Sequence, residues 1–316
     1  MEDLTLIAQD SVLTAPVKMK PFNRIMVSIS GGSDSDVVMD LVLRSVDDKS
    51  KLHFVFFDTG IEYQATKDHL VYLENKYGIQ IERIRPEKPI PLACRDHGQP
   101  FISKHVSEVM MRLQKHGFQW EDEPYDVLVA KYPKCLSALR WWCNQYDDGS
   151  SFNIKRNKWL KEFIVQNPPQ FMISNKCCHF VKKNVAKDYK REHDIDLSVT
   201  GMRKAEGGAR ANAYKSCFTE NLNGVSEYRP IWWFRNEDKV SYENEFSIAH
   251  SDCYVKYGLK RTGCAGCPIG RDLIKEREII QQYEPKLYKA IIKIFGDSYE
   301  YTRRYRAFAE EMKIKQ

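Results

Sequence analysis

The feature that most constrains this 316-residue sequence is a series of apolar segments near its start, separated by helical patterns. Residues 24–30 and 51–60 have the β-branched and aromatic composition of buried strands, and 79–86 alternates apolar and polar side chains like a third strand. Helical spacing of apolar residues follows at 34–46 and 62–78. Strands and helices that alternate in this way form a parallel sheet through right-handed crossovers. The sequence therefore predicts a doubly wound α/β fold.

The pattern changes after the third predicted strand. Residues 101–171 are rich in aromatic and charged side chains and predict a helical insertion, whereas 194–201 is an apolar run that returns the chain to the sheet. Helical patterns then follow at 271–294 and 298–313. We expect four segments: half of a nucleotide-binding domain at 1–100, the insertion at 101–171, the second half with a cysteine cluster at 172–270, and C-terminal helices at 271–316.

Composition indicates an intracellular protein. No apolar run is long enough to cross a bilayer, and the acidic start MEDLTLIAQD lacks the basic region of a signal peptide. The nine cysteines are odd in number and irregularly spaced, which argues against a disulfide framework. We therefore expect a cytoplasmic protein with no membrane partner.

Two glycines directly follow the first predicted strand, in the sequence SISGGSDSD. Glycine lets the backbone approach phosphate oxygens closely, and the helix that begins there offers free N–H groups and the positive end of its dipole. The Gly-Lys-Ser/Thr ending of a Walker A loop is missing. We expect the phosphates of a nucleotide to bind at Ser30, Gly31, Gly32, Ser33, Asp34 and Ser35.

The spacing S-G-G-x-D-S at 30–35 resembles the PP-loop of ATP pyrophosphatases, the adenine nucleotide alpha hydrolase-like superfamily. Later motifs resemble its phosphoadenosine phosphosulfate (PAPS) reductase branch. They are FDTGIEYQAT, NKCCHFVKKNVA, VTGMRKAEGGARA, YRPIWWFRNEDKVSYE (similar to P-L-x-x-W-x-x-x-D-V) and YGLKRTGCAGCP. Because they occur in the family's order, the chain is identified as a member of the PAPS reductase-like family over 24–86 and 172–270.

The resemblance implies a PP-loop fold and a site for ATP with Mg²⁺. Beyond the first loop, the residues that match the family's nucleotide site are Asp58, Thr59, Gly60, Gly201 and Arg203. Those with an expected catalytic role are Asp34, Lys182, Arg203 and Arg210. Fixed guanidinium groups suit polyphosphate or sulfate, which they bind through paired hydrogen bonds.

Four cysteines form two close pairs, Cys177–Cys178 and Cys264–Cys267. Zinc takes four thiolates tetrahedrally, and adjacent cysteines converge on one ion only with strain. A [4Fe–4S] cluster has four iron corners that each take one thiolate, so adjacent cysteines can reach two of them. Cluster-bearing members of the family share the tandem pair. We expect a [4Fe–4S] cluster, with zinc as the less favoured alternative.

Other conspicuous side chains are expected to be structural. We interpret five cysteines as ordinary thiols, namely Cys94, Cys135, Cys143, Cys217 and Cys253. Four tryptophans are expected in the core, namely Trp141, Trp142, Trp232 and Trp233.

The charge balance points weakly to a polyanionic partner. The chain has 49 basic and 43 acidic residues, a net charge of +6. The stretch 154–191 has ten basic and two acidic side chains, a local charge of +8. It is either a solvated face or a surface for a phosphate-rich acceptor such as tRNA or DNA.

The reaction follows from what the family's motifs lack here. PAPS reductases attack sulfur with a C-terminal cysteine in a C-G-x-H setting, and no cysteine follows Cys267. We therefore expect ATP-dependent adenylation of an acceptor, with release of pyrophosphate and cluster-assisted transfer of sulfur from a donor such as a cysteine desulfurase or thioredoxin. The alternatives are a sulfonucleotide reductase that releases sulfite, and a non-catalytic nucleotide sensor of a defence or mobile-element system.

Overall fold

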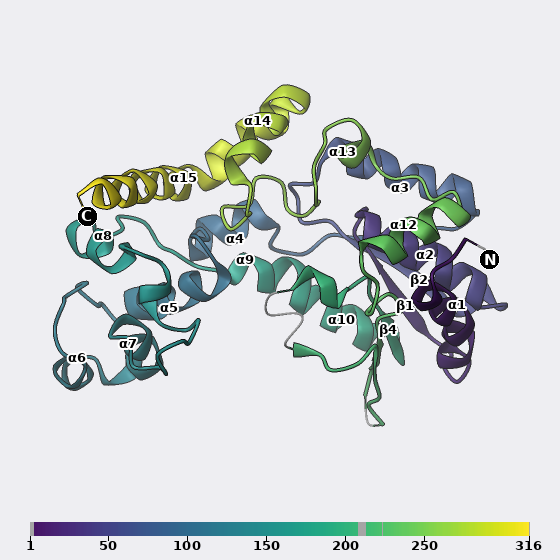
Figure 1. Cartoon of the computed structure of the whole chain (residues 1–316), viewed down its shortest axis with the longest axis horizontal. Helices are drawn as coiled ribbons and strands as arrows, with labels where there is room; N and C mark the ends of the chain where they lie inside the picture. Colours follow the sequence, from purple (N-terminus) through teal and green to yellow (C-terminus); the bar gives the residue numbers. More distant parts are fainter. Residues whose placement is uncertain (1–2, 208–212, 223, 316) are drawn as a thin grey trace. The chain divides into compact units, whose positions relative to one another are not determined.

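The computed structural model describes residues 3–207, 213–222 and 224–315 (Figure 1). Contacts divide the chain into two compact units, each built from two stretches that are far apart in sequence. Unit 1 comprises 1–86 and 181–265, and unit 2 comprises 87–180 and 266–316. In the part of the chain that is described, no helix is long and apolar enough to cross a membrane.

Unit 1 is built on one sheet. Its strands are β1 (Ile25–Ile29), β2 (Leu52–Phe57), β3 (Ile81–Ile84), β4 (Leu197–Val199), β5 (Phe218–Thr219) and β6 (Ser226–Tyr228). Among the described residues their order is β3-β2-β1-β4-β6-β5, and every neighbouring pair is parallel except β5 with β6. The predicted doubly wound α/β fold is confirmed. The sequence did not predict β5 and β6, because these strands of two and three residues have neither an apolar run like that of β4 nor enough length for an alternating pattern.

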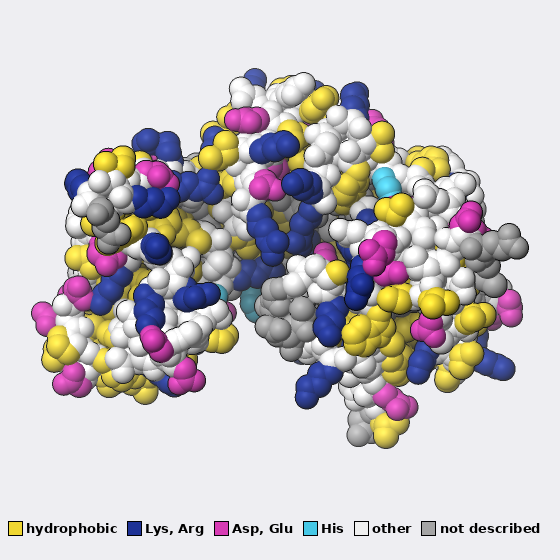
Figure 2. Space-filling view, in the orientation of Figure 1, with side chains coloured by type: hydrophobic (Ala, Val, Ile, Leu, Met, Phe, Trp, Pro, Cys, Tyr) yellow, Lys and Arg dark blue, Asp and Glu magenta, His cyan; other side chains and the backbone are white. Residues whose placement is uncertain are grey.

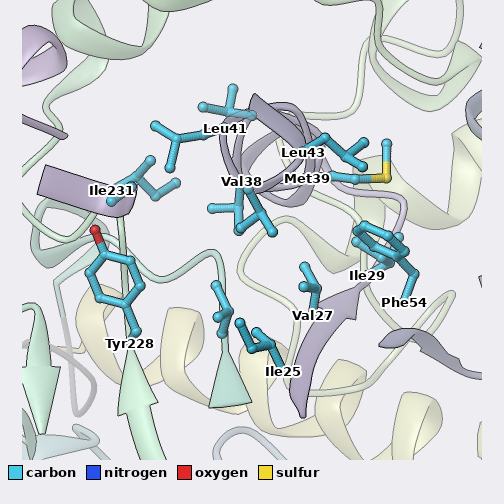
Figure 3. Close-up of a cluster of buried hydrophobic side chains, with 14 of the residues drawn as sticks. Ile25, Val27, Ile29, Val38, Met39, Leu41, Leu43, Phe54, Tyr228 and Ile231 are labelled. Atoms are coloured by element: carbon cyan, nitrogen blue, oxygen red, sulfur yellow. The ribbon is translucent and has the colours of Figure 1, made fainter. Parts of the chain in front are cut away.

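Helices cover both faces of this sheet. They are α1 (Leu6–Met19), α2 (Ser33–Ser45), α3 (Gln64–Tyr77), α10 (Asn184–Glu192), α12 (Asn236–Glu245) and α13 (Asp252–Val255). On one face, Val27 and Ile29 of β1 pack with Val38 of α2 (Figure 3). On the other face, Met26 packs with Tyr189 of α10. Burying one aliphatic side chain of this size stabilises the fold by about 1.5–3 kcal/mol, so the alternation along β1 fixes its register between the two layers.

Unit 2 is helical, which confirms the predicted insertion. Its helices are α4 (Ile90–His97), α5 (Lys104–Lys115), α6 (Tyr125–Lys131), α7 (Leu136–Trp142), α8 (Leu160–Gln166), α9 (Lys176–Cys178), α14 (Leu273–Tyr283) and α15 (Pro285–Ile314). Phe163 of α8 packs against Tyr301 of α15, with ring centroids 4.9 Å apart. The C-terminal helix and the insertion therefore share one core.

The predicted break between the last two helices is wrong in position. The sequence predicts helices at 271–294 and 298–313, but α14 ends at Tyr283 and α15 begins at Pro285. Proline has no N–H to donate and disfavours helical backbone in the residue before it, and Glu284 has φ −135° and ψ 62°. Proline in the first position of a helix is well tolerated, so α15 starts there and continues.

The prediction that the tryptophan pairs are core holds for three of the four side chains. Trp141, Trp142 and Trp232 are buried. Trp233 is 45% exposed, with Lys204 Nζ 5.0 Å from its ring centroid. Trp232 and Trp233 lie in irregular backbone, where adjacent side chains point in different directions. One therefore enters the core and the other faces solvent.

Candidate functional site

The loop 30–35 lies at the carboxyl edge of the sheet in unit 1, between β1 and α2. The strand order runs from β1 to β2 and β3 on one side and continues with β4 on the other side of β1. This reversal beside β1 is the topological switch point, where open α/β sheets bind their ligands. The loops that leave β2 and β4 emerge at the same edge, because both strands are parallel to β1.

Hydrogen bonds within the loop fix its shape. Ser35 Oγ accepts from Ser30 N at 3.3 Å and donates to Gly32 O at 2.7 Å, and Gly32 N donates to Ser30 Oγ at 3.3 Å. Gly32 is also the N-cap of α2. The first N–H groups of a helix have no partner within the helix. The two serines therefore hold the loop open at the positive end of α2, which is the arrangement an anion requires.

The two glycines of the loop face different neighbours. Gly31 has φ +64°, and a Cβ there would lie 2.6 Å from Thr66 Cγ2. A Cβ on Gly32 would lie 3.1 Å from the hydroxyl oxygen of Thr262 and 3.2 Å from that of Tyr254. These two hydroxyls are hydrogen bonded to each other at 3.0 Å. Gly32 is therefore surrounded by hydroxyl groups, and we expect phosphate oxygens beside it.

Asp34 meets two cations at the mouth of the loop. Arg203 Nε and Lys239 Nζ each lie 3.1 Å from Asp34 Oδ1, and Lys239 also donates to Ser33 Oγ. Asp34 Oδ1 and Arg203 Nε are buried, yet neither makes a well-aligned hydrogen bond with any residue that the structure describes. A carboxylate beside two cations suits a metal–polyphosphate ligand, because Mg²⁺ prefers carboxylate oxygens and phosphate prefers the cations.

Lys239 is the functional candidate that sequence reasoning missed. In the pattern P-L-x-x-W-x-x-x-D-V, Asp238 stands at the aspartate and Lys239 at the valine. Asp238 accepts from Arg235 N at 2.7 Å and caps α12, which places Lys239 in the first turn of that helix. The departure from valine to lysine is the sequence signal that identifies this residue.

Lys239 is linked to a series of polar side chains through Glu243. Glu243, one turn along α12, lies 3.4 Å from Lys239 Nζ and 2.8 Å from His250 Nε2. His250 Nδ1 lies 2.9 Å from Asp36 Oδ2, and the buried His69 Nε2 lies 3.1 Å from the same oxygen. Asp36 belongs to the first turn of α2. These contacts, which we call the relay, therefore lead from Lys239 through Glu243 and His250 back to the helix that follows the loop 30–35.

Stability at alkaline pH tests the relay. Burial lowers the pKa of His250, but hydrogen bonds with Asp36 and Glu243 outweigh it and raise the pKa to about 9. The unfolded pKa is about 6.5, so the contribution of protonated His250 is complete below that pH and is lost as pH rises through 9. We expect a decrease in unfolding free energy on the order of 2 kcal/mol between about pH 6.5 and 10, measured by urea denaturation.

The control for this measurement is a histidine outside the relay. His250→Gln should remove most of the pH dependence in this range, whereas His116→Gln in unit 2 should retain it. If the unfolding free energies of the wild type and His250→Gln depend on pH in the same way, protonated His250 does not stabilise the fold through Asp36 and Glu243.

The loop after β2 is held by its own side chains. Asp58 Oδ1 accepts from Gly60 N at 2.9 Å, and Thr59 donates to Glu62 Oε1 from its N at 3.1 Å and its Oγ1 at 2.5 Å. Burial raises the pKa of Glu62, although the Thr59 hydrogen bonds and the charge of Lys182 oppose it. Lys182 therefore acts electrostatically on this loop. That Asp58, Thr59 and Gly60 contact the nucleotide stays a prediction.

Gly201 allows the loop after β4 to pack closely against the loop 30–35. A Cβ at Gly201 would lie 2.9 Å from Asp34 O and 3.2 Å from Ser35 N, so a side chain there would displace the start of α2. Arg203, two residues later, reaches Asp34 because of this close approach. Arg210 lies outside the described residues, and its expected role stays a prediction.

The tandem cysteines lie on α9 in unit 2, to which Cys267 also belongs. A hydrogen bond from Cys178 lowers the pKa of Cys177, but a hydrogen bond with Cys94, burial, and the charges of the Cys94 and Cys267 thiolates outweigh it and raise the pKa well above its ordinary value. Metals bind the thiolate, and a bound metal supplies the positive charge that removes the proton. This soft donor set fits iron–sulfur chemistry.

Cys94 is a second residue that sequence reasoning missed. We expected an ordinary thiol, but α4 packs against α9 and brings Cys94 to Cys177. The nine cysteines, all of which lie in the described residues, form no disulfide bond. Nothing in the spacing of Cys94 identifies it, because its nearest partner is more than 80 residues away in the sequence.

Cys264 belongs to unit 1, where the next residue, Ala265, donates its N–H to Ile61 O at 3.2 Å. Cys264 therefore lies close to the loop that follows β2. Within the described ranges, no three His, Cys, Asp or Glu side chains are arranged to hold a metal ion. The four-cysteine ligand set stays a prediction.

Comparisons with known proteins support the family resemblance in the first part of the chain. A phosphoadenosine phosphosulfate reductase domain matches residues 24–117. The uncharacterized protein MJ0066 of Methanocaldococcus jannaschii is 40% identical over 265 residues, which cover 84% of this chain and 40% of that protein. The chain spans less than half the length of the curated relatives that it matches.

Two solved structures are distantly similar. The PAPS reductase of Candida auris in a phosphate complex has 14% identity and a TM-score of 0.43, with 81% of this chain and 87% of that chain covered. The U34-tRNA thiolase NcsA of Methanococcus maripaludis with its [4Fe–4S] cluster has 12% identity and a TM-score of 0.38, with 96% and 80% covered. The fold assignment rests on the strand order of this chain itself.

Proposed function

We propose that this chain is a PP-loop enzyme similar to PAPS reductases, and that it binds ATP with Mg²⁺ and adenylates an acceptor with release of pyrophosphate. The observation that carries the proposal is the meeting of Arg203 and Lys239 at Asp34, beside the loop 30–35. Two cations with side chains only 12% and 13% exposed, placed at a helix N-terminus, suit a polyphosphate.

The residues of the loop and its two cations would act on the leaving group. Backbone N–H groups at the start of α2 would bind the β- and γ-phosphates, and Asp34 would bind Mg²⁺. As the acceptor nucleophile forms a bond to the α-phosphorus, the bond from that phosphorus to the bridging oxygen breaks. Arg203 and Lys239 would balance the charge that develops on pyrophosphate as it leaves.

The cysteines would serve a second, sulfur-transferring step. Adenylation turns an acceptor oxygen into a good leaving group, so an incoming sulfide could bond to the acceptor carbon while AMP departs with the oxygen. A [4Fe–4S] cluster at Cys177, Cys178, Cys264 and Cys267, when bound, would supply a place to hold sulfide. The sulfur would come from a donor such as a cysteine desulfurase as a persulfide, and a dithiol such as thioredoxin would reduce it to sulfide with two electrons while becoming a disulfide.

Exchange between ATP and labelled pyrophosphate tests the adenylation step. We expect exchange that depends on Mg²⁺ and on an acceptor, with tRNA and duplex DNA as the first candidates. Sulfite release from a sulfonucleotide, without exchange, would establish the reductase alternative, which the domain match over 24–117 supports. Nucleotide binding without either reaction would leave the sensor alternative.

Lys239 should discriminate between nucleotides by their phosphate number. Lys239→Val restores the residue of the family pattern and removes one charge-assisted contact, so ATP affinity should fall about 10- to 100-fold. AMP has no β- or γ-phosphate, and its affinity should change by less than about threefold. Calorimetric titration with both nucleotides measures the difference.

The matched control is Lys67→Val, an exposed lysine on α3 in the same unit. It should leave both affinities unchanged. If Lys239→Val weakens ATP and AMP equally, Lys239 only supports the fold of the loop and does not contact phosphate.

A further inference from the structure

The basic segment 154–191 is less charged than its sequence indicates. Lys155 pairs with Asp148, and Lys161 pairs with Asp122 at 2.5 Å, both partners lying outside the segment. Figure 2 shows that Lys and Arg side chains on the visible face of unit 2 are interspersed with acidic ones. Two of the ten basic side chains of this segment are therefore neutralised by residues outside it.

A stronger concentration of positive charge lies in one pocket of unit 2. The pocket has a volume of about 500 Å³ and is lined by residues of α4, α5, the short helix Pro133–Cys135, and α9. Its basic lining consists of Arg112, Lys115, Lys134 and Lys176, with His97 and His116. We call this feature the lysine pocket.

The lysines of this pocket are not neutralised by the protein. Lys115, Lys134 and Lys176 have no ion-pair partner among the residues that the structure describes. By contrast, Asp96, which also lines the pocket, is paired with Lys88 at 3.2 Å and with Arg95 at 3.0 Å. The lysine pocket therefore keeps three uncompensated positive charges.

Two further effects bear on the potential inside the pocket. Helices α4 and α5 both end there, and a helix C-terminus carries about half a negative charge. Together they offset about one of the three lysine charges. A net positive charge remains. Burial lowers the pKa of His97, and the charges of Lys176 and Lys88 lower it further, although Asp96 opposes them.

The chemistry of the lining indicates which anion would bind. Arginine gives fixed bidentate recognition of one phosphate, whereas lysine is a flexible point charge. The guanidinium of Arg112 is already engaged by Glu108 at 2.5 Å and by Ser137 Oγ at 3.0 Å. Three lysines from three separate elements suit the successive phosphates of an extended strand, which such contacts hold without reading bases.

We propose that the lysine pocket binds the phosphodiester backbone of a nucleic acid. Lys176 directly precedes Cys177, and α4, which contributes His97 to the pocket, also carries Cys94, the neighbour of Cys177. A strand in the pocket therefore lies beside the tandem cysteines. The inference rests on the proposed function in taking this nucleic acid as the acceptor, although binding itself does not require adenylation.

Charge reversal in the pocket tests the proposal in the full chain. Fluorescence anisotropy with labelled tRNA and with single-stranded DNA, between about 50 and 200 mM salt, gives affinity and its salt dependence. Lys115→Glu combined with Lys134→Glu should weaken both ligands by about tenfold or more at the lower salt, and should flatten the log–log salt slope by about 1.4, because each contact to a single strand contributes about 0.7.

The matched control reverses the same amount of charge elsewhere in unit 2. Lys286→Glu combined with Lys289→Glu, on the exposed face of α15, should change binding by less than about twofold. An equal loss in both double variants would overturn the proposal, because it would reflect net charge alone. Circular dichroism and ATP affinity, unchanged in both, show that the fold is intact.

Two further outcomes distinguish nucleic-acid binding in the pocket from the alternative occupant and from the proposed function. If the wild-type protein binds pyrophosphate in the lysine pocket but neither nucleic acid, the occupant is a small phosphorylated molecule and the proposal fails. If nucleic acid binds through the pocket but ATP–pyrophosphate exchange never occurs, the proposed function fails and the binding site remains.

Discussion

The Gly32→Val variant is expected to fold and to lose ATP binding by at least about 100-fold. Gly32 has φ −94° and ψ 151°, an extended conformation that valine adopts without strain. Its Cβ would nevertheless lie 3.1–3.2 Å from the hydroxyl oxygens of Ser30, Thr262 and Tyr254, and its methyl groups would add bulk at the N-cap of α2, where we expect the phosphates. The loss should therefore come from blocked phosphate approach and not from misfolding.

Calorimetric titration of ATP with Mg²⁺, combined with thermal unfolding, separates these two causes. Gly149→Val is the matched control, because a Cβ at that glycine has no neighbour within 4 Å. ATP affinity that survives in a folded Gly32→Val variant would remove the nucleotide from this loop. An Asp34→Ala variant should also fail to bind Mg²⁺–ATP, since it removes the carboxylate that Arg203 and Lys239 share.

Protein purified without oxygen is expected to be brown and to contain about four irons per chain, and Cys178→Ser to lose most of them. The reason is the donor set: four cysteines in two close pairs, of which Cys177 is a buried thiol that a bound cluster would ionise. Iron analysis and anaerobic absorption spectra measure the effect directly.

Other cysteines provide the controls for the iron measurement. Cys217→Ser, in unit 1, should keep full iron content. Cys94→Ser tests whether Cys94 is a ligand of the cluster, because Cys94 contacts Cys177 without belonging to either close pair. Full iron in Cys94→Ser would make Cys94 a neighbour of the cluster and not a ligand. Stoichiometric zinc and no iron in the wild-type protein would overturn the cluster proposal.

The sheet and the position of the loop 30–35 could be predicted because their signals are local. Strands buried on both faces appear in the sequence as continuous apolar runs, as at 24–30 and 51–60. Gly78 ends α3 in the left-handed conformation that only glycine adopts readily, at φ +61°. The glycines of the loop 30–35 follow β1 directly, so their place at the sheet edge needed no long-range information.

The rest of the site depends on contacts that a linear pattern does not contain. Lys239 reaches Ser33 across 206 positions of sequence, and Cys94 reaches Cys177 only because α4 packs against α9. The lysine pocket collects Lys115, Lys134 and Lys176 from three elements, and no window of the sequence shows them together. Charge counts along the chain instead favoured 154–191, where acidic residues from elsewhere neutralise part of the charge.

The interleaving of the two units has a consequence for how the chain reaches this structure. Ile25 of β1 pairs with Leu197 of β4, so the central pairing of the sheet closes a loop of about 170 residues. Such distant contacts slow folding. During synthesis β1, β2 and β3 emerge long before β4, so one edge of β1 stays unpaired. The helices of the insertion emerge next, and they lack their packing partner until α15 is made. Neither unit can be completed before most of the chain has left the ribosome, so exposed strand edges make chaperone dependence and aggregation during expression the expected weakness of this architecture.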